Sequence, residues 1–370
     1  MSRYQFELSC PKDDQDLRVL FAATPMDGNV RVRLEHDPAV HRQHASDDHL
    51  HQTIVCRDTL SGRVIGAGSR QINLRYVNGQ LRPVGYLGGL RCLPEHRSRG
   101  LVARGYAFLK ELHQDQRADF YLTTIAADNA SAERVLTSGR AGLPVYRPIG
   151  RFHTLLCCSH NRRRHPSNDS VEIRTAESND LPAIARLVQH SGPDRQFFPA
   201  YGADDFQDSN GTFHGLSLES ILVARRGGQL VGLLAGWNQS SFRRAVIAGY
   251  NSLWKWLRPA WNAWASIRQR PRLPGIDEAL VYLTAACPLV INSDPAIFAG
   301  LLDAAIDQQL PDQRTSLTLG LADNDPLLGV ARSRRWREYV TNIFLVSWPD
   351  TQPDLPTLDH RPIYLELGCL

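Results

Sequence analysis

The sequence predicts an α/β protein made of two similar halves. Two parts of the chain repeat one layout, a helical segment followed by a hairpin: residues 16–24 with 53–68, and residues 171–188 with 221–236. The stretch YLTTIAADN, which ends at Asn129, also resembles SLTLGLADN, which ends at Asn324, at an offset of 195 residues. Because internal repetition of this kind marks duplicated units, we expect two related domains.

The length of 370 residues and a hydrophobic content of 42% are enough for two sizeable cores. We expect the first domain over residues 1–158 and the second over 171–348. The segment 159–170 is polar and basic and contains a proline, as is typical of a linker. In the tail, residues 349–370, the run 361–370 reads as a further strand that pairs with a sheet edge.

Composition narrows the class of protein. The start, MSRYQFELSC, has no apolar signal region, and no uninterrupted apolar run approaches the length of a membrane span. The 7 cysteines form neither a paired framework nor a metal-ligand spacing, which favours a reducing compartment. A net charge of +4 is small for this length and argues against nucleic-acid binding. We therefore expect a soluble cytoplasmic protein.

The most informative segment is HRSRGLVARGYAFLKEL, residues 96–112, a basic turn that leads into an amphipathic helix. Backbone N–H groups of the turn and the positive end of the helix dipole favour an anion. Gly100 carries no Cβ, so a ligand can approach its backbone closely. These features predict a diphosphate site, with an ordinary charged helix N-terminus as the competing interpretation.

The segment VGYLGGLRCLP, residues 84–94, precedes this turn and reads as a strand with three glycines. The order strand, basic turn, helix resembles the core of the GNAT N-acetyltransferase superfamily, whose signature is Arg or Gln, two residues, Gly, one residue, then Gly or Ala. Here the signature reads Arg97-Ser98-Arg99-Gly100-Leu101-Val102, and the next small residue is Ala103. The sequence therefore departs from the family pattern at Val102.

The resemblance implies two α/β (α+β) domains in tandem, each a mixed, mostly antiparallel twisted sheet flanked by helices, and acetyl-CoA as co-substrate. It implies that the fourth strand splays from the fifth and pairs with the pantetheine arm, while the turn holds the pyrophosphate. The cofactor-binding residues expected on this basis are Leu90, Cys92, Leu93, Arg97, Ser98, Arg99, Gly100, Leu101, Val102, Ala103 and Asn129. For Asn129, a helix N-cap is an equally good interpretation.

The resemblance also implies a catalytic acid, a tyrosine on the helix after the fifth strand, but the matching position is Leu136. Tyr146 is the substitute if the intervening loop folds back. Glu35, His49 and His51 are candidates for the base that deprotonates the acceptor amine, and a base from the second domain is equally possible. The mechanism expected is direct attack in a ternary complex. A covalent route through Cys92 is the alternative, but no nucleophile motif surrounds it.

Five histidines crowd the region before residue 52. They are His36, His41, His44, His49 and His51. Their spacing matches no compact ligand motif, so we predict no metal site.

The second domain lacks the basic turn. After its strand the chain reads INSDPAIFAGLLDAAI, in which Asp294 would repel a diphosphate and neither an arginine nor an early glycine is present. We therefore expect a degenerate second GNAT domain that does not bind CoA.

An insertion, residues 241–275, carries four of the 7 tryptophans and no acidic residue. Trp254, Leu257, Trp261, Trp264 and Ile267 repeat at helical spacing, and Pro259 is expected to kink or split the helix. Three interpretations compete: packing on its own domain or a second subunit, contact of residues 250–268 with a membrane surface, or a wall for the acceptor.

The function expected from these observations is transfer of an acetyl group from acetyl-CoA to a primary amine of a small molecule or peptide. A non-catalytic acyl-CoA sensor or scaffold is the rival, because the acid is missing and Val102 departs from the pattern. An aminoacyl-tRNA-dependent transferase is a third possibility that would demand a broad basic surface.

Overall fold

The computed structural model describes residues 2–26, 28, 30–36, 49–140, 142–157, 170–207, 211–267, 272–310, 315–348 and 355–370. The expected linker lies outside these ranges except for its last residue, and so do His41, His44 and Cys158.

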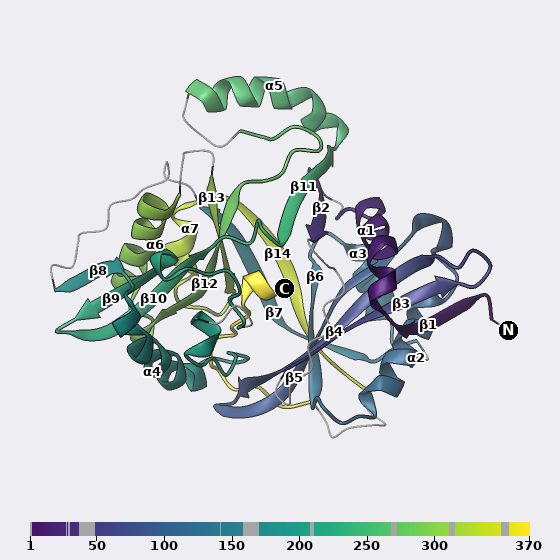
Figure 1. Ribbon diagram of the computed structural model, residues 1–370, viewed down its shortest axis with the longest axis horizontal. Coiled ribbons are helices and arrows are strands. Elements are labelled where there is room, and N and C mark those ends of the chain that lie inside the picture. Colours follow the sequence, from purple (N-terminus) through teal and green to yellow (C-terminus); the bar gives the residue numbers. More distant parts are fainter. Residues whose placement is uncertain are drawn as a thin grey trace.

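One large twisted sheet runs through the molecule, with helices on both faces (Figure 1). In spatial order its strands are β1 (Tyr4–Leu8), β3 (His49–Asp58), β4 (Val64–Val77), β5 (Gln80–Cys92), β6 (Phe120–Ala126), β14 (Arg335–Ser347), β7 (Val145–Cys157), β13 (Ser316–Ala322), β12 (Tyr282–Val290), β10 (Gln229–Trp237), β9 (Ile221–Arg226) and β8 (Val171–Thr175). The helices are α1 (Asp14–Ala23), α2 (Leu101–His113), α3 (Ala130–Leu136), α4 (Leu181–Ser191), α5 (Ser252–Ile267), α6 (Pro295–Gln309) and α7 (Leu328–Arg332).

The pairing confirms a mixed, mostly antiparallel sheet. Among the strand pairs of the described chain, β5 with β6 and β12 with β13 run parallel, and the others run antiparallel. Each parallel pair is joined through a helix, α2 in the first half and α6 in the second, as parallel strands require. The two halves thus repeat one topology.

The halves exchange their last strands. Strand β14 lies between β6 and β7 of the first half, and β7 in turn pairs with β13 of the second half. The β7–β14 ladder runs from Val145 opposite Ser347 to Cys157 opposite Arg335. Because of this exchange the sheet is continuous, while the domain boundaries at 158 and 171 stay a prediction.

Several helices and hairpins that local sequence patterns predict are present in the structure. In α4, Leu181, Ile184, Leu187 and Val188 are buried on one face. The β9–β10 hairpin turns at Gly227 and Gly228, both with positive φ, and the β3–β4 hairpin turns at Ser61–Gly62. The helix predicted after residue 129 is α3.

The tail does not form the expected strand. Among residues 355–370, Ile363 makes a single bridge to Gln196, and Leu367–Cys369 is a short 3-10 turn. Ile363 packs with the core of the first half, whereas Tyr364 packs with that of the second half. The tail therefore lies in the middle of the molecule, not at a sheet edge, and burial on both sides produced the strand-like pattern.

Residues 252–267 of the insertion form one helix, α5, so Pro259 does not split it. This helix follows a separate two-stranded sheet of β2 (Val30–His36) and β11 (Arg243–Tyr250) and stands away from the main sheet (Figure 1).

Candidate functional site

The site begins where β5 and β6 separate. They pair only from Val84–Tyr86 to Phe120–Leu122, although β5 continues to Cys92 and β6 to Ala126. Beyond that point β5 follows β4 and β6 follows β14. The expected splaying of these two strands is confirmed.

Hydroxyl groups close the base of this opening. Thr123 Oγ1 donates a hydrogen bond of 2.7 Å to the Leu87 carbonyl, and the hydroxyls of Tyr86 and Thr124 lie 2.8 Å apart. Thr123 and Thr124 project from opposite faces of β6. Hydrogen bonds therefore link the two strands on both faces of the sheet at the apex, the point where β5 and β6 separate.

A β-bulge interrupts β5 inside the opening. Ala67 on β4 faces Arg91, but Ser69 faces Gly88, so Gly89 and Leu90 share one position. Gly89 has φ +64°, a conformation that glycine adopts readily, and Leu90 is 45% exposed. The bulge therefore presents its backbone to solvent at the place where the resemblance implies the pantetheine arm.

The basic turn lies just beyond the end of β5. Ser98 and Gly100 have φ +61° and +70°, which makes successive backbone N–H groups converge. The amides of Ser98 through Ala103 have no acceptor among the described residues. With the arginines at 97 and 99 exposed beside it, this turn presents unbonded N–H groups and positive charge at the N-terminus of α2.

Two side chains after the turn explain the departure from the family pattern. Leu101 is buried among Tyr4, Cys56 and Ile65. Val102 packs against the hydrophobic cluster beneath α2, which includes Tyr106, Tyr121 and Leu136. The extra methyl groups of Val102 therefore add to the core, while Ala103 keeps the next position small.

Cys92 and Leu93 also pack inward at the end of β5. Burial raises the pKa of the Cys92 thiol, so this group stays protonated near neutral pH. Among the described residues Arg97 lowers this pKa, but burial outweighs it, so the thiol lacks the activation that a covalent acyl-enzyme needs.

Asn129 caps the helix that follows β6. Its Oδ1 accepts a hydrogen bond of 3.1 Å from the Ala132 N–H, so the N-cap interpretation is confirmed. A contact between Asn129 and a cofactor stays a prediction. At the end of the same helix, Leu136 is 6% exposed and belongs to the core beneath α2.

Tyr146 lies on β7 and forms a hydroxyl–hydroxyl hydrogen bond with Tyr106 of α2. Burial raises its pKa. In the sheet it faces Val346, which faces Tyr121, a row that lies before β5 and β6 separate. The register thus does not bring Tyr146 to the opening, and its catalytic role stays a prediction.

Two of the three candidate bases, Glu35 and His51, lie on strands of different sheets. Glu35 lies on β2 in the separate two-stranded sheet, where it forms ion pairs with Arg33 and Arg244. His51 lies on β3 of the main sheet and faces Gln71 on β4, which in turn faces Tyr86 on β5. Because adjacent strands are ~4.8 Å apart, His51 lies roughly 10 Å from Tyr86 across the sheet.

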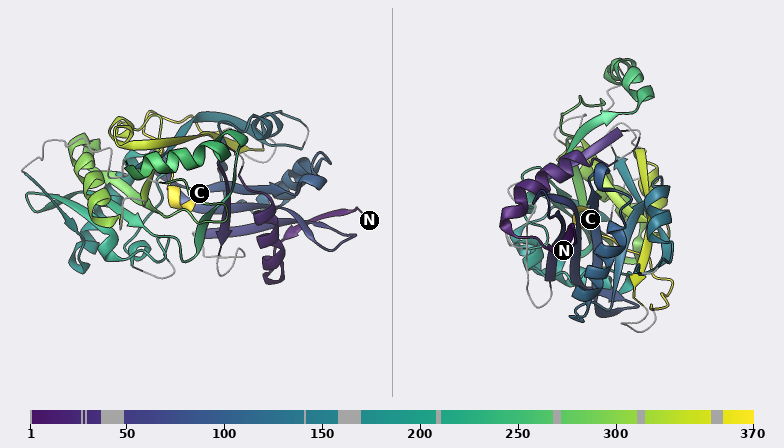
Figure 2. Two further views of the ribbon diagram at one scale, coloured as in Figure 1. Left: turned by 90° about the horizontal axis from the view of Figure 1, so that it is seen from above. Right: turned by 90° about the vertical axis from the view of Figure 1, so that its right-hand side faces the viewer.

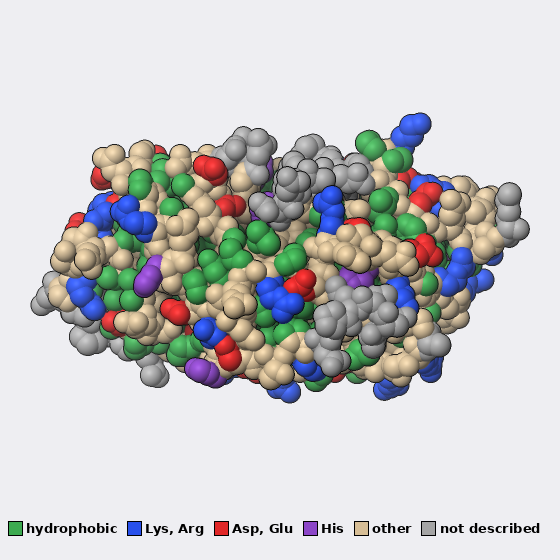
Figure 3. Space-filling view, turned by 90° about the horizontal axis from the view of Figure 1, so that it is seen from below, with side chains coloured by type: hydrophobic (Ala, Val, Ile, Leu, Met, Phe, Trp, Pro, Cys, Tyr) green, Lys and Arg blue, Asp and Glu red, His purple; other side chains and the backbone are tan. Residues whose placement is uncertain are grey.

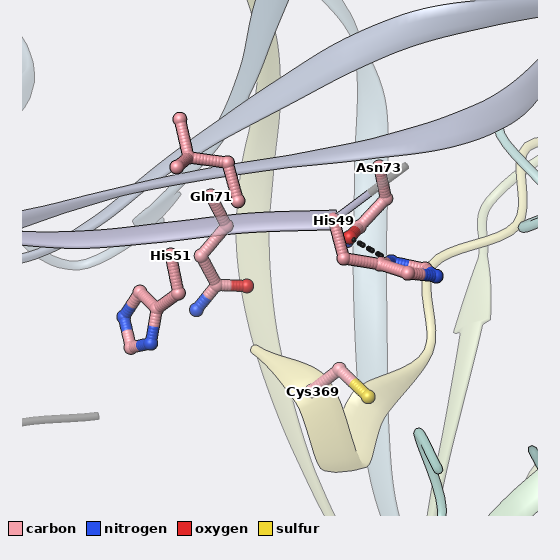
Figure 4. Close-up of a pocket in the computed structure, with 6 residues that line it drawn as sticks. His49, His51, Gln71, Asn73 and Cys369 are labelled. Atoms are coloured by element: carbon pink, nitrogen blue, oxygen red, sulfur yellow. Dashed lines mark hydrogen bonds between the residues drawn. The ribbon is translucent and has the colours of Figure 1, made fainter. Parts of the chain in front are cut away.

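A pocket lies between the strand residues His51 and Gln71 and the tail residue Cys369 (Figure 4). Its lining residues are His49, Leu50, His51, Gln71, Asn73 and Cys369. The side chains of Gln71 and His51 extend from their strands on the side of Cys369, and His49 Nδ1 lies 2.7 Å from Asn73 Oδ1. This pocket is on the face of the sheet opposite α2, since Leu50 and Ile72 contact the cluster beneath α2 from the alternate positions.

Sequence reasoning missed Tyr339. It lies on β14, two residues from Thr341, which faces Ala126 at the end of β6. Burial and Asp128 raise the pKa of Tyr339, while Arg91 lowers it, so both charged groups lie within electrostatic range of the phenol. Because β14 belongs to the other half, no local pattern in the sequence places it here.

The second half repeats the opening, but a carboxylate occupies the start of its helix. Strands β12 and β13 pair only from Tyr282–Thr284 to Ser316–Thr318. At the start of α6, Asp294 Oδ1 accepts hydrogen bonds from the N–H groups of Ala296 and Ile297. Burial pushes the pKa of Asp294 up, but these bonds and Arg226 outweigh it and lower the pKa. A fixed carboxylate thus occupies the helix N-terminus.

No protein-family model matches the chain, and no curated protein is similar to it in sequence. Solved structures match it over nearly its whole length. A GCN5-related N-acetyltransferase from Sphaerobacter thermophilus aligns with a TM-score of 0.55 at 12% identity and covers 96% of this chain and 98% of its own. A tandem GNAT protein from the clavulanic acid biosynthesis pathway aligns with a TM-score of 0.55 at 12% identity, covering 95% and 99%.

The chain has a tandem GNAT fold. Saccharomyces cerevisiae N-myristoyltransferase, solved with bound myristoyl-CoA, shares the fold with a TM-score of 0.52 at 11% identity, over 94% of this chain and 80% of that chain. In the tandem GNAT fold of this protein, the two openings between parallel strands are the equivalent places of the two halves.

Three further observations concern surface charge, metal ligands and membrane-spanning helices. On the face shown in Figure 3, basic side chains lie in separate groups among acidic and hydrophobic ones. Within the described ranges, no group of three or more His, Cys, Asp or Glu side chains is arranged to hold a metal ion, and no helix is long and apolar enough to cross a membrane.

Proposed function

We propose that the protein is an N-acyltransferase that binds acetyl-CoA in its first half and transfers the acetyl group to a primary amine. The observation that carries this proposal is the exposed anion site at the N-terminus of α2, with the amides from Ser98 to Ala103 unbonded among the described residues, directly beside the bulged and splayed β5. The structural neighbours, named as N-acetyltransferases and an N-myristoyltransferase, support the acyl-transfer class.

In the proposed complex, the N–H groups of the turn and the arginines at 97 and 99 bind the diphosphate. The pantetheine arm follows the exposed edge of β5 at Leu90 into the opening. A backbone N–H of the bulge, at Gly89 or Leu90, donates to the thioester carbonyl and stabilises the negative charge that develops on that oxygen.

The acceptor enters from the opposite face of the sheet, through the pocket lined by His51, Gln71 and Cys369. The neutral amine attacks the thioester carbon, a C–N bond forms and the C–S bond breaks. The ammonium proton passes to His51 through water, since His51 lies roughly 10 Å from the apex. We propose Tyr339 as the group that returns a proton to the departing thiolate, with Tyr146 as the second candidate.

The test is calorimetric titration with acetyl-CoA followed by an assay of thiol release with a panel of amines. Binding of one acetyl-CoA and amine-dependent release of CoA support the proposal. Failure to bind acetyl-CoA would overturn it.

A non-catalytic acyl-CoA sensor is the second candidate function. The specific observation in its favour is that Leu136 is a buried core residue, so no acid stands where the family places one. Tight binding of acetyl-CoA without thiol release for any amine would favour this alternative.

A further inference from the structure

Helix α5 presents an apolar face that the other described residues leave exposed. Leu253, Trp256 and Ile267 are 63%, 84% and 82% exposed, respectively. Together with Leu257, Ala260, Ala263 and Trp264, they form one stripe along the helix, spaced at three or four residues. A large exposed apolar stripe of this kind marks an interaction surface.

The opposite face of α5 anchors the helix. Trp254 and Trp261 pack with Ile247, Tyr250 and Leu273 of the stalk formed by β2, β11 and the returning chain. Asn262 strengthens this attachment, since its side chain bonds both the N–H and the carbonyl of Leu273. The orientation of the exposed stripe is therefore fixed by packing, and Figure 2 shows the helix held clear of the main body.

The charge of this unit favours one kind of partner. Residues 30–36 and 243–280 contain nine Lys or Arg and three Asp or Glu, a net charge of +6, whereas the whole chain carries +4. Lys255 is exposed beside the apolar stripe, and the guanidinium of Arg258 lies 5.8 Å from the centre of the Tyr250 ring. Basic groups beside exposed tryptophan and aliphatic side chains suit the interface of an anionic lipid bilayer.

We propose that α5 docks the protein on anionic membrane surfaces, with the stripe of Leu253, Trp256 and Ile267 inserted among the lipid headgroups. The helix lies in the plane of the interface and does not span the bilayer. The proposal does not depend on acyl transfer, because neither the stripe nor its basic flank belongs to the opening between β5 and β6.

Vesicle flotation with the full chain tests this proposal. We expect the protein to float with vesicles of phosphatidylcholine and phosphatidylglycerol but much less with phosphatidylcholine alone, and less at high salt. The triple variant Leu253→Ser, Trp256→Ser, Ile267→Ser should lose about tenfold or more of the vesicle binding. Leu60→Ser is the matched control, because Leu60 is 77% exposed in the β3–β4 turn of the other half.

A second variant and a second measurement separate the alternatives. Lys255→Glu should weaken binding to anionic vesicles while leaving the apolar stripe intact. Light scattering should give one monomer mass for the wild type and the triple variant. Equal flotation of wild type and triple variant would overturn the proposal, as would a dimer that the triple variant dissociates, since the stripe would then bind a second copy.

Discussion

The carboxylate of Glu366 accepts a hydrogen bond of 3.0 Å from the backbone N–H of Cys287. Cys287 lies in a bulge of β12, with φ +46°, at the position that Gly89 occupies in β5 with φ +64°. In the first half this bulge is exposed, but in the second half Cys287 is completely buried beneath the tail. The second opening is thus filled by the protein's own carboxylate.

In the second half, carboxyl groups of the protein itself therefore bond the backbone N–H groups at both of the equivalent positions. Asp294 caps the helix that corresponds to α2, and Glu366 bonds the bulge amide that corresponds to Gly89. The same duplicated framework thus leaves the first opening exposed and fills the equivalent place in the second half.

The first prediction concerns the pH dependence of stability. Burial raises the pKa of Glu366 to about 7, although the hydroxyl of Tyr364 and the amide of Cys287 lower it. Since the folded state holds this proton more tightly, the stability that it provides is complete below the pKa of the unfolded chain and is lost as the pH rises toward 7. Relative to wild type, Glu366→Gln should gain on the order of 2–3 kcal/mol between pH 5 and 8.

Urea unfolding at a series of pH values measures this difference. Glu219→Gln, at an exposed glutamate, is the control and should follow the wild-type curve. Parallel curves for Glu366→Gln and wild type would show that the folded carboxylate has no such shift.

The second prediction concerns the turn before α2. Gly100→Asp should weaken acetyl-CoA binding by about tenfold or more, because it adds a negative charge where the diphosphate binds and strains a backbone at φ +70°. Gly228→Asp is the matched control, since Gly228 has φ +79° and its Cβ would also enter open space. Arg97→Glu should act like Gly100→Asp. If both variants bind acetyl-CoA with wild-type affinity, the turn before α2 is not the diphosphate site.

The third prediction separates capping from cofactor contact. Asn129→Ala and Asp294→Ala each remove an N-cap bond and should each cost about 1 kcal/mol in the free energy of unfolding. Only Asn129→Ala should also weaken binding of acetyl-CoA, because α3 begins beside the opening. If calorimetry shows unchanged affinity in Asn129→Ala, this residue is a cap alone.

The fourth prediction concerns the proton donor. Tyr339→Phe should lower kcat by about 10²-fold without changing the affinity for acetyl-CoA, because it removes one hydroxyl at the mouth of the opening. Tyr146→Phe is the matched change in the core, and it should leave kcat near the wild-type value. The reverse order of effects would assign the acid to Tyr146.

The fifth prediction excludes a covalent route. Cys92→Ala should retain most of the kcat, since burial keeps the thiol protonated and no base activates it. A variant that binds acetyl-CoA normally but has lost turnover would restore the acyl-enzyme mechanism.

The strand, turn and helix from Val84 to His113 could be predicted because their signals are local: strand-forming residues, Gly100 at a positive φ, and apolar spacing along α2. The hairpins and the duplicated layout followed from the same kind of pattern. The sequence offset of 195 between the two halves is one residue too small at the end of the repeated strand. The equivalent turns show this, because Asn129 in the first half corresponds to Asp325 in the second.

Features that depend on distant pairing could not be predicted. The exchange of β7 and β14, which brings Tyr339 to the opening, leaves no trace in either strand's own sequence. The tail alternates Ile363 and Leu365 with Tyr364 as an edge strand would, yet its two sides face two different cores. The ion pair of Glu35 with Arg244, which joins the two halves, also has no local signal in the sequence.

Calorimetric stoichiometry of acetyl-CoA binding to the intact chain tests the central claim most directly. One molecule per chain, lost in Gly100→Asp and kept in Asp294→Ala, is the result that an open first site and a closed second site predict. Two molecules per chain, none at all, or a single molecule that Gly100→Asp does not displace would contradict it.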